Sequence, residues 1–117
     1  MSENNKAHDL IITIVNRGLA DDVVDATKTA GATGGTIIHG RGTGIHETAK
    51  LFGIPIEPEK DIVLTLIEQS MTEAVLNAVN EALELNKPGK GIAFVLDVEK
   101  TIGINHSYIK TEEQAES

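Results

Sequence analysis

The sequence predicts an α+β sandwich, in which one antiparallel sheet carries two helices on a single face. Four short runs are rich in Val, Ile, Leu and Thr, as strands are, and two longer runs repeat apolar residues at helical spacing. Their order along the chain is β-α-β-β-α-β. The length of 117 residues favours one domain spanning 1–117, with polar ends at 1–8 and 109–117.

The first half of the chain predicts a strand, a helix and a second strand. Asp9–Asn16 contains the apolar, β-branched core LIITIV, which is typical of a buried central strand. A helix is expected after Gly18, because Asp21 and Asp22 place negative charge where a helix N-terminus favours it. Its apolar stripe follows helical spacing, at Leu19, Val23, Ala26, Thr27 and Ala30. The second strand is expected over Thr36–His39.

The second half predicts a third strand over Lys60–Ile67 and a fourth over Ile92–Val98. Between them, Ser70 and Glu73 form the S-x-x-E pattern of a capping box, in which each side chain bonds a free backbone N–H group at the helix start. The apolar face of this helix is predicted at Met71, Ala74, Val75, Ala78, Val79, Ala82 and Leu83.

The predicted order, joined by right-handed crossovers, gives a ferredoxin-like sandwich. Both faces of the predicted strands are apolar, whereas two helices can cover only one of them. The other face would be bare in a monomer, so we expect the chain to associate through it.

Composition narrows the classes of function. The net charge of −8 argues against a nucleic-acid binder, which needs a basic face to neutralise phosphates. The lack of cysteine excludes disulfides and thiol chemistry. No apolar run approaches the roughly 20 residues needed to cross a membrane, and MSENNKAHD lacks the apolar core of a signal peptide. We therefore expect a cytoplasmic protein with no direct membrane insertion.

Residues 42–59 show neither helical nor strand periodicity, and such a long segment inside a small domain is usually functional or disordered. Gly40, Gly42 and Gly44 at its start leave one face of an extended chain without side chains, so a ligand or another backbone can approach. The apolar stretch LFGIPI predicts a partner-binding tip, and the alternative is a loop folded back over the core. The predicted partner-binding residues are Leu51, Phe52, Ile54 and Ile56.

Several stretches together resemble the PII-type signalling proteins: ADDVVDA, GATGGTI, the glycines Gly42 and Gly44, Lys60 before the third strand, and PGKGIAFVLDV. The resemblance extends from Leu10 to Asn105. It implies a non-catalytic homotrimer that binds ATP or ADP, with AMP as a further alternative and with or without Mg²⁺, in clefts between subunits. It also implies a long loop that regulates a partner protein, either a membrane transporter or a metabolic enzyme.

The resemblance also implies the residues of the nucleotide site. Thr36 matches a threonine whose hydroxyl recognises adenine, and Ile14 and Leu66 match apolar positions around the base. The glycine-bearing loop before the fourth strand would offer backbone N–H groups and two lysines to phosphate oxygens, and the alternative is a plain turn from helix to strand. The complete predicted set is Ile14, Thr36, Arg41, Gly42, Gly44, Leu66, Lys87, Gly89, Lys90, Gly91 and His106.

The chain also departs from the family pattern. Ile92 occupies the position of a phosphate-facing lysine, and Gly103 and Asn105 occupy the positions of two arginines. His46 replaces the glutamine that the family uses with magnesium and 2-oxoglutarate, and the long loop contains no tyrosine for uridylylation. These departures predict rearranged phosphate contacts and insensitivity to 2-oxoglutarate.

Two other functions compete with this one. The first is a small nucleotide phosphohydrolase using His46 or Glu47 with a divalent ion, although the sequence offers no carboxylate cluster of the kind such ions prefer. The second is a metal-tolerance trimer of the CutA type, which shares the architecture. Lys50 stands where an H-E-x-x-H motif needs its second histidine, and solvated histidines are expected at His39 and His46 rather than metal ligands. No metal site is therefore predicted.

Overall fold

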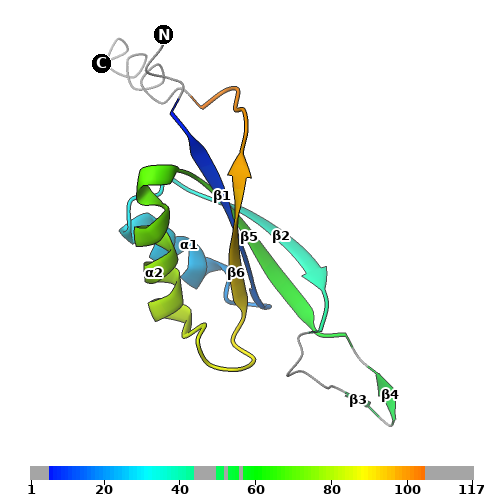
Figure 1. Cartoon of the computed structure of the whole chain (residues 1–117). Coiled ribbons are helices and arrows are strands. Elements are labelled where there is room, and N and C mark those ends of the chain that lie inside the picture. Colours follow the sequence, from blue (N-terminus) through cyan, green and yellow to red (C-terminus); the bar gives the residue numbers. More distant parts are fainter. Residues whose placement is uncertain (1–5, 44–49, 52, 56, 105–117) are drawn as a thin grey trace, which may run out of the picture.

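The computed structural model describes residues 6–43, 50–51, 53–55 and 57–104 (Figure 1). Its elements are, in chain order, β1 (His8–Asn16), α1 (Ala20–Thr29), β2 (Thr36–Arg41), β3 (Lys50–Leu51), β4 (Ile54–Pro55), β5 (Glu59–Glu68), the 3-10 turn η1 (Gln69–Met71), α2 (Thr72–Leu83) and β6 (Ile92–Val98).

Four strands form the main sheet, in the order β2-β5-β1-β6, with each neighbouring pair antiparallel. The two helices pack against each other on one face of this sheet (Figure 1). The long strands therefore follow the predicted βαββαβ order, and the predicted α+β sandwich with two helices on one face is confirmed.

The core lies between the sheet and the helices. Ile11 and Val15 of β1 and Val63 of β5 are fully buried on the helix-covered face. They pack into one cluster with apolar residues of both helices, including Val23 and Val79. Burying a side chain of this size contributes about 1.5–3 kcal/mol, so these contacts hold the helices on the sheet.

The opposite face of the sheet is uncovered in the single chain. Strand register places directly opposed residues on the same face, and their side chains alternate along each strand. Phe94 is 41% exposed and Leu96 is 49% exposed on this side. The uncovered face carries Leu10, Ile12, Ile14, Ile38, Ile62, Leu64, Leu66, Ile92, Phe94 and Leu96. A bare apolar face was expected from the sequence, and it is present.

The predicted capping box is wrong. Gln69–Met71 forms the η1 turn, and the start of α2 has no side-chain cap hydrogen bond within the described part of the chain. The Thr72 hydroxyl instead donates to Asp9 Oδ2 at 2.8 Å. The helix start is thus held by a contact with β1. The buried face of α2 is also shifted from the predicted one, because Ala74 and Ala82 are exposed and the buried residues are Thr72, Val75, Val79 and Leu83.

The long loop is more regular than its sequence suggests. β3 and β4 pair as a short hairpin, in which Lys50 lies opposite Pro55 and Leu51 opposite Ile54. Gly53 lies in the connecting turn with φ of +80°, a conformation that glycine adopts without strain. Strands of two residues are too short to show a period of two, so the pattern did not reveal them. The hairpin lies beyond the ends of β2 and β5 (Figure 1).

Candidate functional site

The predicted adenine-contacting residues lie on the uncovered face. Thr36 opens β2 opposite Leu64, and Leu66 lies two residues further along β5. Ile14 is opposite Ile62 on the same face. Thr36 is exposed, Leu66 is 39% exposed and Ile14 is half-buried, so each remains open to a ligand or to another chain.

The loop from Lys87 to Gly91 lies against the end of β1. A Cβ atom added at Gly91, where φ is +138°, would be 2.7 Å from the Ile14 carbonyl oxygen, so only glycine fits. Gly89 also has a positive φ of +78°, but the space around it is open. The structure therefore brings the predicted phosphate loop close to Ile14, with an accessible backbone at Gly89.

The predicted cations differ in their surroundings. Lys87 Nζ is 3.2 Å from Glu84 Oε2, an ion pair at the end of α2. Lys90 is exposed, and so is Arg41 at the end of β2. The Gly42 N–H donates to the Pro58 carbonyl at 3.1 Å, which continues the strand pairing into the base of the loop.

The predicted residues do not form a single cluster: Arg41 and Gly91 lie at one end of the sheet, whereas Leu66 lies toward the other end. β2, which ends at Arg41, and β6, which begins after Gly91, are the two outer strands. Three strand spacings separate them, about 14 Å in all. Gly44, His106, Phe52 and Ile56 lie outside the described residues. Leu51 is placed in β3, and Ile54 of β4 is 65% exposed.

A second polar site, which the sequence did not reveal, surrounds Asp61 of β5. Asp61 is 3% exposed, and its carboxylate accepts the Gly18 N–H at 2.9 Å and the Ala20 N–H at 3.2 Å. Asp61 thus caps the start of α1 from a neighbouring strand. The Gly18 N–H, followed by the hydrogen bond from His39, lowers the pKa of the Asp61 carboxyl against the opposing effect of burial.

His39 belongs to this site, and its side chain, although 76% exposed, also contacts Asp61. It lies in β2 directly opposite Asp61, and its Nδ1 atom is 2.9 Å from Asp61 Oδ1. Because Asp61 is ionised, the neutral imidazole must carry its proton on Nδ1 and donate it. One signal was available in the sequence: Asp61 is a charged residue at the start of an apolar strand, and a buried charge requires partners.

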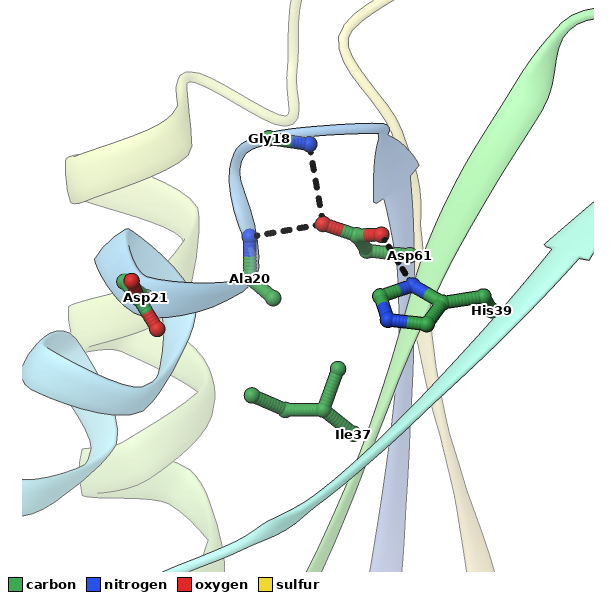
Figure 2. Close-up of a pocket in the computed structure, with 6 residues that line it drawn as sticks. All are labelled: Gly18, Ala20, Asp21, Ile37, His39 and Asp61. Atoms are coloured by element: carbon green, nitrogen blue, oxygen red, sulfur yellow. Dashed lines mark hydrogen bonds and ion pairs between the residues drawn. The ribbon is translucent and has the colours of Figure 1, made fainter.

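A shallow hollow of about 350 Å³ adjoins His39 and Asp61 (Figure 2). It lies between the start of α1 and the outer strand β2, on the helix-covered side of the sheet. The residues that line it are Gly18, Ala20, Asp21, Ile37, His39 and Asp61. Among the residues that the structure describes, no group of three His, Cys, Asp or Glu side chains is arranged to hold a metal ion.

Further contacts join the β1–α1 turn to the returning end of the long loop. The Arg17 N–H donates to the Glu59 carbonyl at 3.2 Å, and the two side chains form an ion pair. Lys60 Nζ donates to Asn16 Oδ1 at 2.7 Å. Together with Asp61, these contacts hold the base of the loop against the body of the domain.

A comparison with protein-family models matches residues 8–108 to the family described as Nitrogen regulatory protein P-II. No curated protein matches the chain. None of the helices in the described part of the chain is long and apolar enough to span a membrane.

Proposed function

Because the chain belongs to the nitrogen regulatory protein P-II family, we propose that it is a non-catalytic regulator that binds adenine nucleotides and acts on a partner through residues 42–59. The family match carries this proposal, since it spans every element from β1 to β6. The architecture agrees with it: an antiparallel sheet, two helices on one face and a long loop between β2 and β5.

The nucleotide would bind where copies of the chain meet. Ile14, Thr36 and Leu66 lie on the same uncovered face as the other apolar residues of the sheet. A face of this size is usually covered in solution, and a homotrimer packed through it would border these three residues. The site would then lie in a cleft between subunits and would be incomplete in a single chain.

The phosphates would contact mainly backbone N–H groups and few cations. Gly89 leaves its backbone open, and Lys90 and Arg41 are exposed near the two sides of the predicted site. Ile92, which is 56% exposed, presents an apolar side chain where the family pattern has a lysine. This supports a site for ATP or ADP, with AMP as an alternative and with or without Mg²⁺, in which 2-oxoglutarate has no effect.

The loop at residues 42–59 would transmit the effect of the bound nucleotide to the partner protein. Its base is held by the hydrogen bond from Gly42 to Pro58, close to the predicted nucleotide. A nucleotide that contacts this base differently in two loop states shifts their populations by its difference in affinity. A coupling of about 1–3 kcal/mol would suffice to regulate a partner. The partner is proposed to be a membrane transporter or a metabolic enzyme, contacted by Ile54 and its neighbours.

Calorimetric titration with ATP, ADP and AMP, with and without magnesium, tests the proposal. Thr36→Val should weaken binding by about 0.5–1.5 kcal/mol, because it removes one hydrogen bond to the base. Thr33→Val, in the exposed segment before β2, is the matched control and should bind like the parent. A parent protein that binds none of the three nucleotides, or that releases phosphate from ATP at a steady catalytic rate, would refute the proposal.

A further inference from the structure

Asp61 divides its two carboxylate oxygens between two parts of the chain. Oδ1 lies 2.9 Å from Nδ1 of His39, on the strand that leads into the long loop. Oδ2 accepts the N–H groups of Gly18 and Ala20, before and at the start of α1. Figure 2 shows the carboxylate between these two sets of donors. Both oxygens belong to one planar group, so a rotation that breaks the bond on one side also weakens the bonds on the other.

The returning side of the long loop is bound to the same turn. The Glu59 carbonyl accepts the Arg17 N–H, and the side chains of these two residues form an ion pair. Lys60 Nζ donates to Asn16 Oδ1 at 2.7 Å. With Asp61, the first three residues of β5 therefore all contact the segment 16–20, which leads from β1 into α1.

The start of α1 depends on Asp61 for its cap. The first N–H groups of a helix have no partner within the helix, and the apolar side chain of Leu19 offers none at the N-cap position. The buried Asp61 carboxylate supplies an acceptor from β5 instead. A buried carboxylate that loses one of its donors is costly, so the loss of the His39 bond favours a rearrangement of Asp61.

We propose that Asp61 is a conformational relay, through which the base of the long loop and the start of α1 loosen together. A displacement of β2 that withdraws His39 Nδ1 leaves the buried charge with one donor fewer. The carboxylate then turns toward water, and its bonds to Gly18 and Ala20 weaken. Such coupling is reciprocal, because whatever orders the start of α1 favours the His39 contact by the same factor.

The relay links the loop to the helix layer. Thr36, Ile14 and Leu66 lie on the uncovered face of the sheet, whereas α1 lies on the other face. A change at the base of the loop is thus transmitted to the helix-covered side by contacts within a single chain. This inference does not depend on what moves the loop, and it holds whether or not the chain binds nucleotides.

Amide hydrogen exchange of the full chain, measured by NMR, tests the proposal in the variant His39→Phe. This change keeps a ring at the exposed position but removes the donor to Asp61. We expect the amides of Gly18 and Ala20 to exchange about tenfold faster, as for the loss of one hydrogen bond to a charged group. The amide of Ile12, which lies in the middle of β1 and pairs with both neighbouring strands, should exchange at the parent rate.

His8→Phe is the matched control variant. His8 lies opposite Glu68, at the far end of β1 from Asp61, so the same substitution should leave the exchange of Gly18 and Ala20 unchanged. The proposal is overturned if His39→Phe does not accelerate these two amides, if it accelerates Ile12 equally, or if His8→Phe accelerates them as much.

A long-range ¹⁵N spectrum of the parent at pH 8 checks the bond on which the relay depends. The imidazole of His39 should carry its proton on Nδ1, because the ionised Asp61 can only accept. A proton found on Nε2 would also overturn the proposal.

Discussion

Asp61 determines much of the local structure at the base of the loop. One buried carboxylate joins its own strand, β5, to two segments that are distant in the sequence: the β1–α1 turn through Gly18 and Ala20, and β2 through His39. A charge at this depth is tolerated only because three donors replace its lost water. Asp61 therefore couples the start of α1 to the point where the loop returns.

Replacing Asp61 by Asn should cost about 1.5–3 kcal/mol of unfolding free energy at neutral pH, because Asn removes the charge from these bonds. The pKa of Asp61 is lowered in the folded chain, so its contribution is present above the unfolded value of about 3.9 and is lost as pH falls through the folded value. The difference between parent and Asp61→Asn should therefore narrow as pH falls below about 5.

Urea unfolding at a series of pH values measures this difference. Asp25→Asn is the control, because Asp25 is an exposed residue of α1. The unfolding free energy of Asp25→Asn should stay close to that of the parent at every pH. If the difference in unfolding free energy between the parent and Asp61→Asn stays constant down to about pH 3, the charge of Asp61 does not strengthen these hydrogen bonds.

The glycines before β6 show how backbone conformation places an element. Gly89 and Gly91 both have positive φ, but only Gly91 is packed against β1. Gly89→Ala should cost about 1–2 kcal/mol, which is the usual strain of a left-handed residue. Gly91→Ala should cost more, because its Cβ would also lie 2.7 Å from the Ile14 carbonyl oxygen.

Chemical denaturation of both variants measures these costs. Ile92 follows Gly91 and pairs with Ile14. The NMR chemical shift of its amide should change in Gly91→Ala and remain unchanged in Gly89→Ala. Equal destabilisation of the two variants would mean that the loop relaxes away from β1 and that the packing at Gly91 is not required.

The whole molecule has one helix-covered face and one bare face. Phe94 lies on the bare face, in the middle of the outer strand β6 and opposite Ile12 of β1. In a homotrimer packed through this face, Phe94→Asp would place a charge in an apolar contact without a partner, at a cost of several kcal/mol. We expect the parent to have three times the mass of the 12.5 kDa chain and Phe94→Asp to be smaller while keeping its helices.

Light scattering after size-exclusion chromatography measures both masses, and circular dichroism checks that the variant is folded. Asn77→Asp adds the same charge to an exposed position of α2 and should leave the mass unchanged. A monomeric parent at micromolar concentration would contradict the homotrimer and, with it, a nucleotide cleft between subunits.

The sequence by itself determined the order of the long elements, the two-faced sheet and the family. Strand and helix periods are local, and the run Ile92–Val98 matches β6 at both ends. The family resemblance identified Thr36, Ile14 and Leu66 as candidate adenine contacts. The strand register shows that all three lie on the same face of the sheet. Whether they bind adenine remains a prediction.

Only the tertiary structure decided how distant residues meet. His39 and Asp61 are 22 positions apart, and Thr72 and Asp9 are 63 apart. No local pattern encodes such pairs, because they depend on which strands become neighbours in the sheet. For that reason the capping box at Ser70 was wrong and the hollow beside His39 was not predicted: both depend on contacts that form only after the sheet and helices have packed.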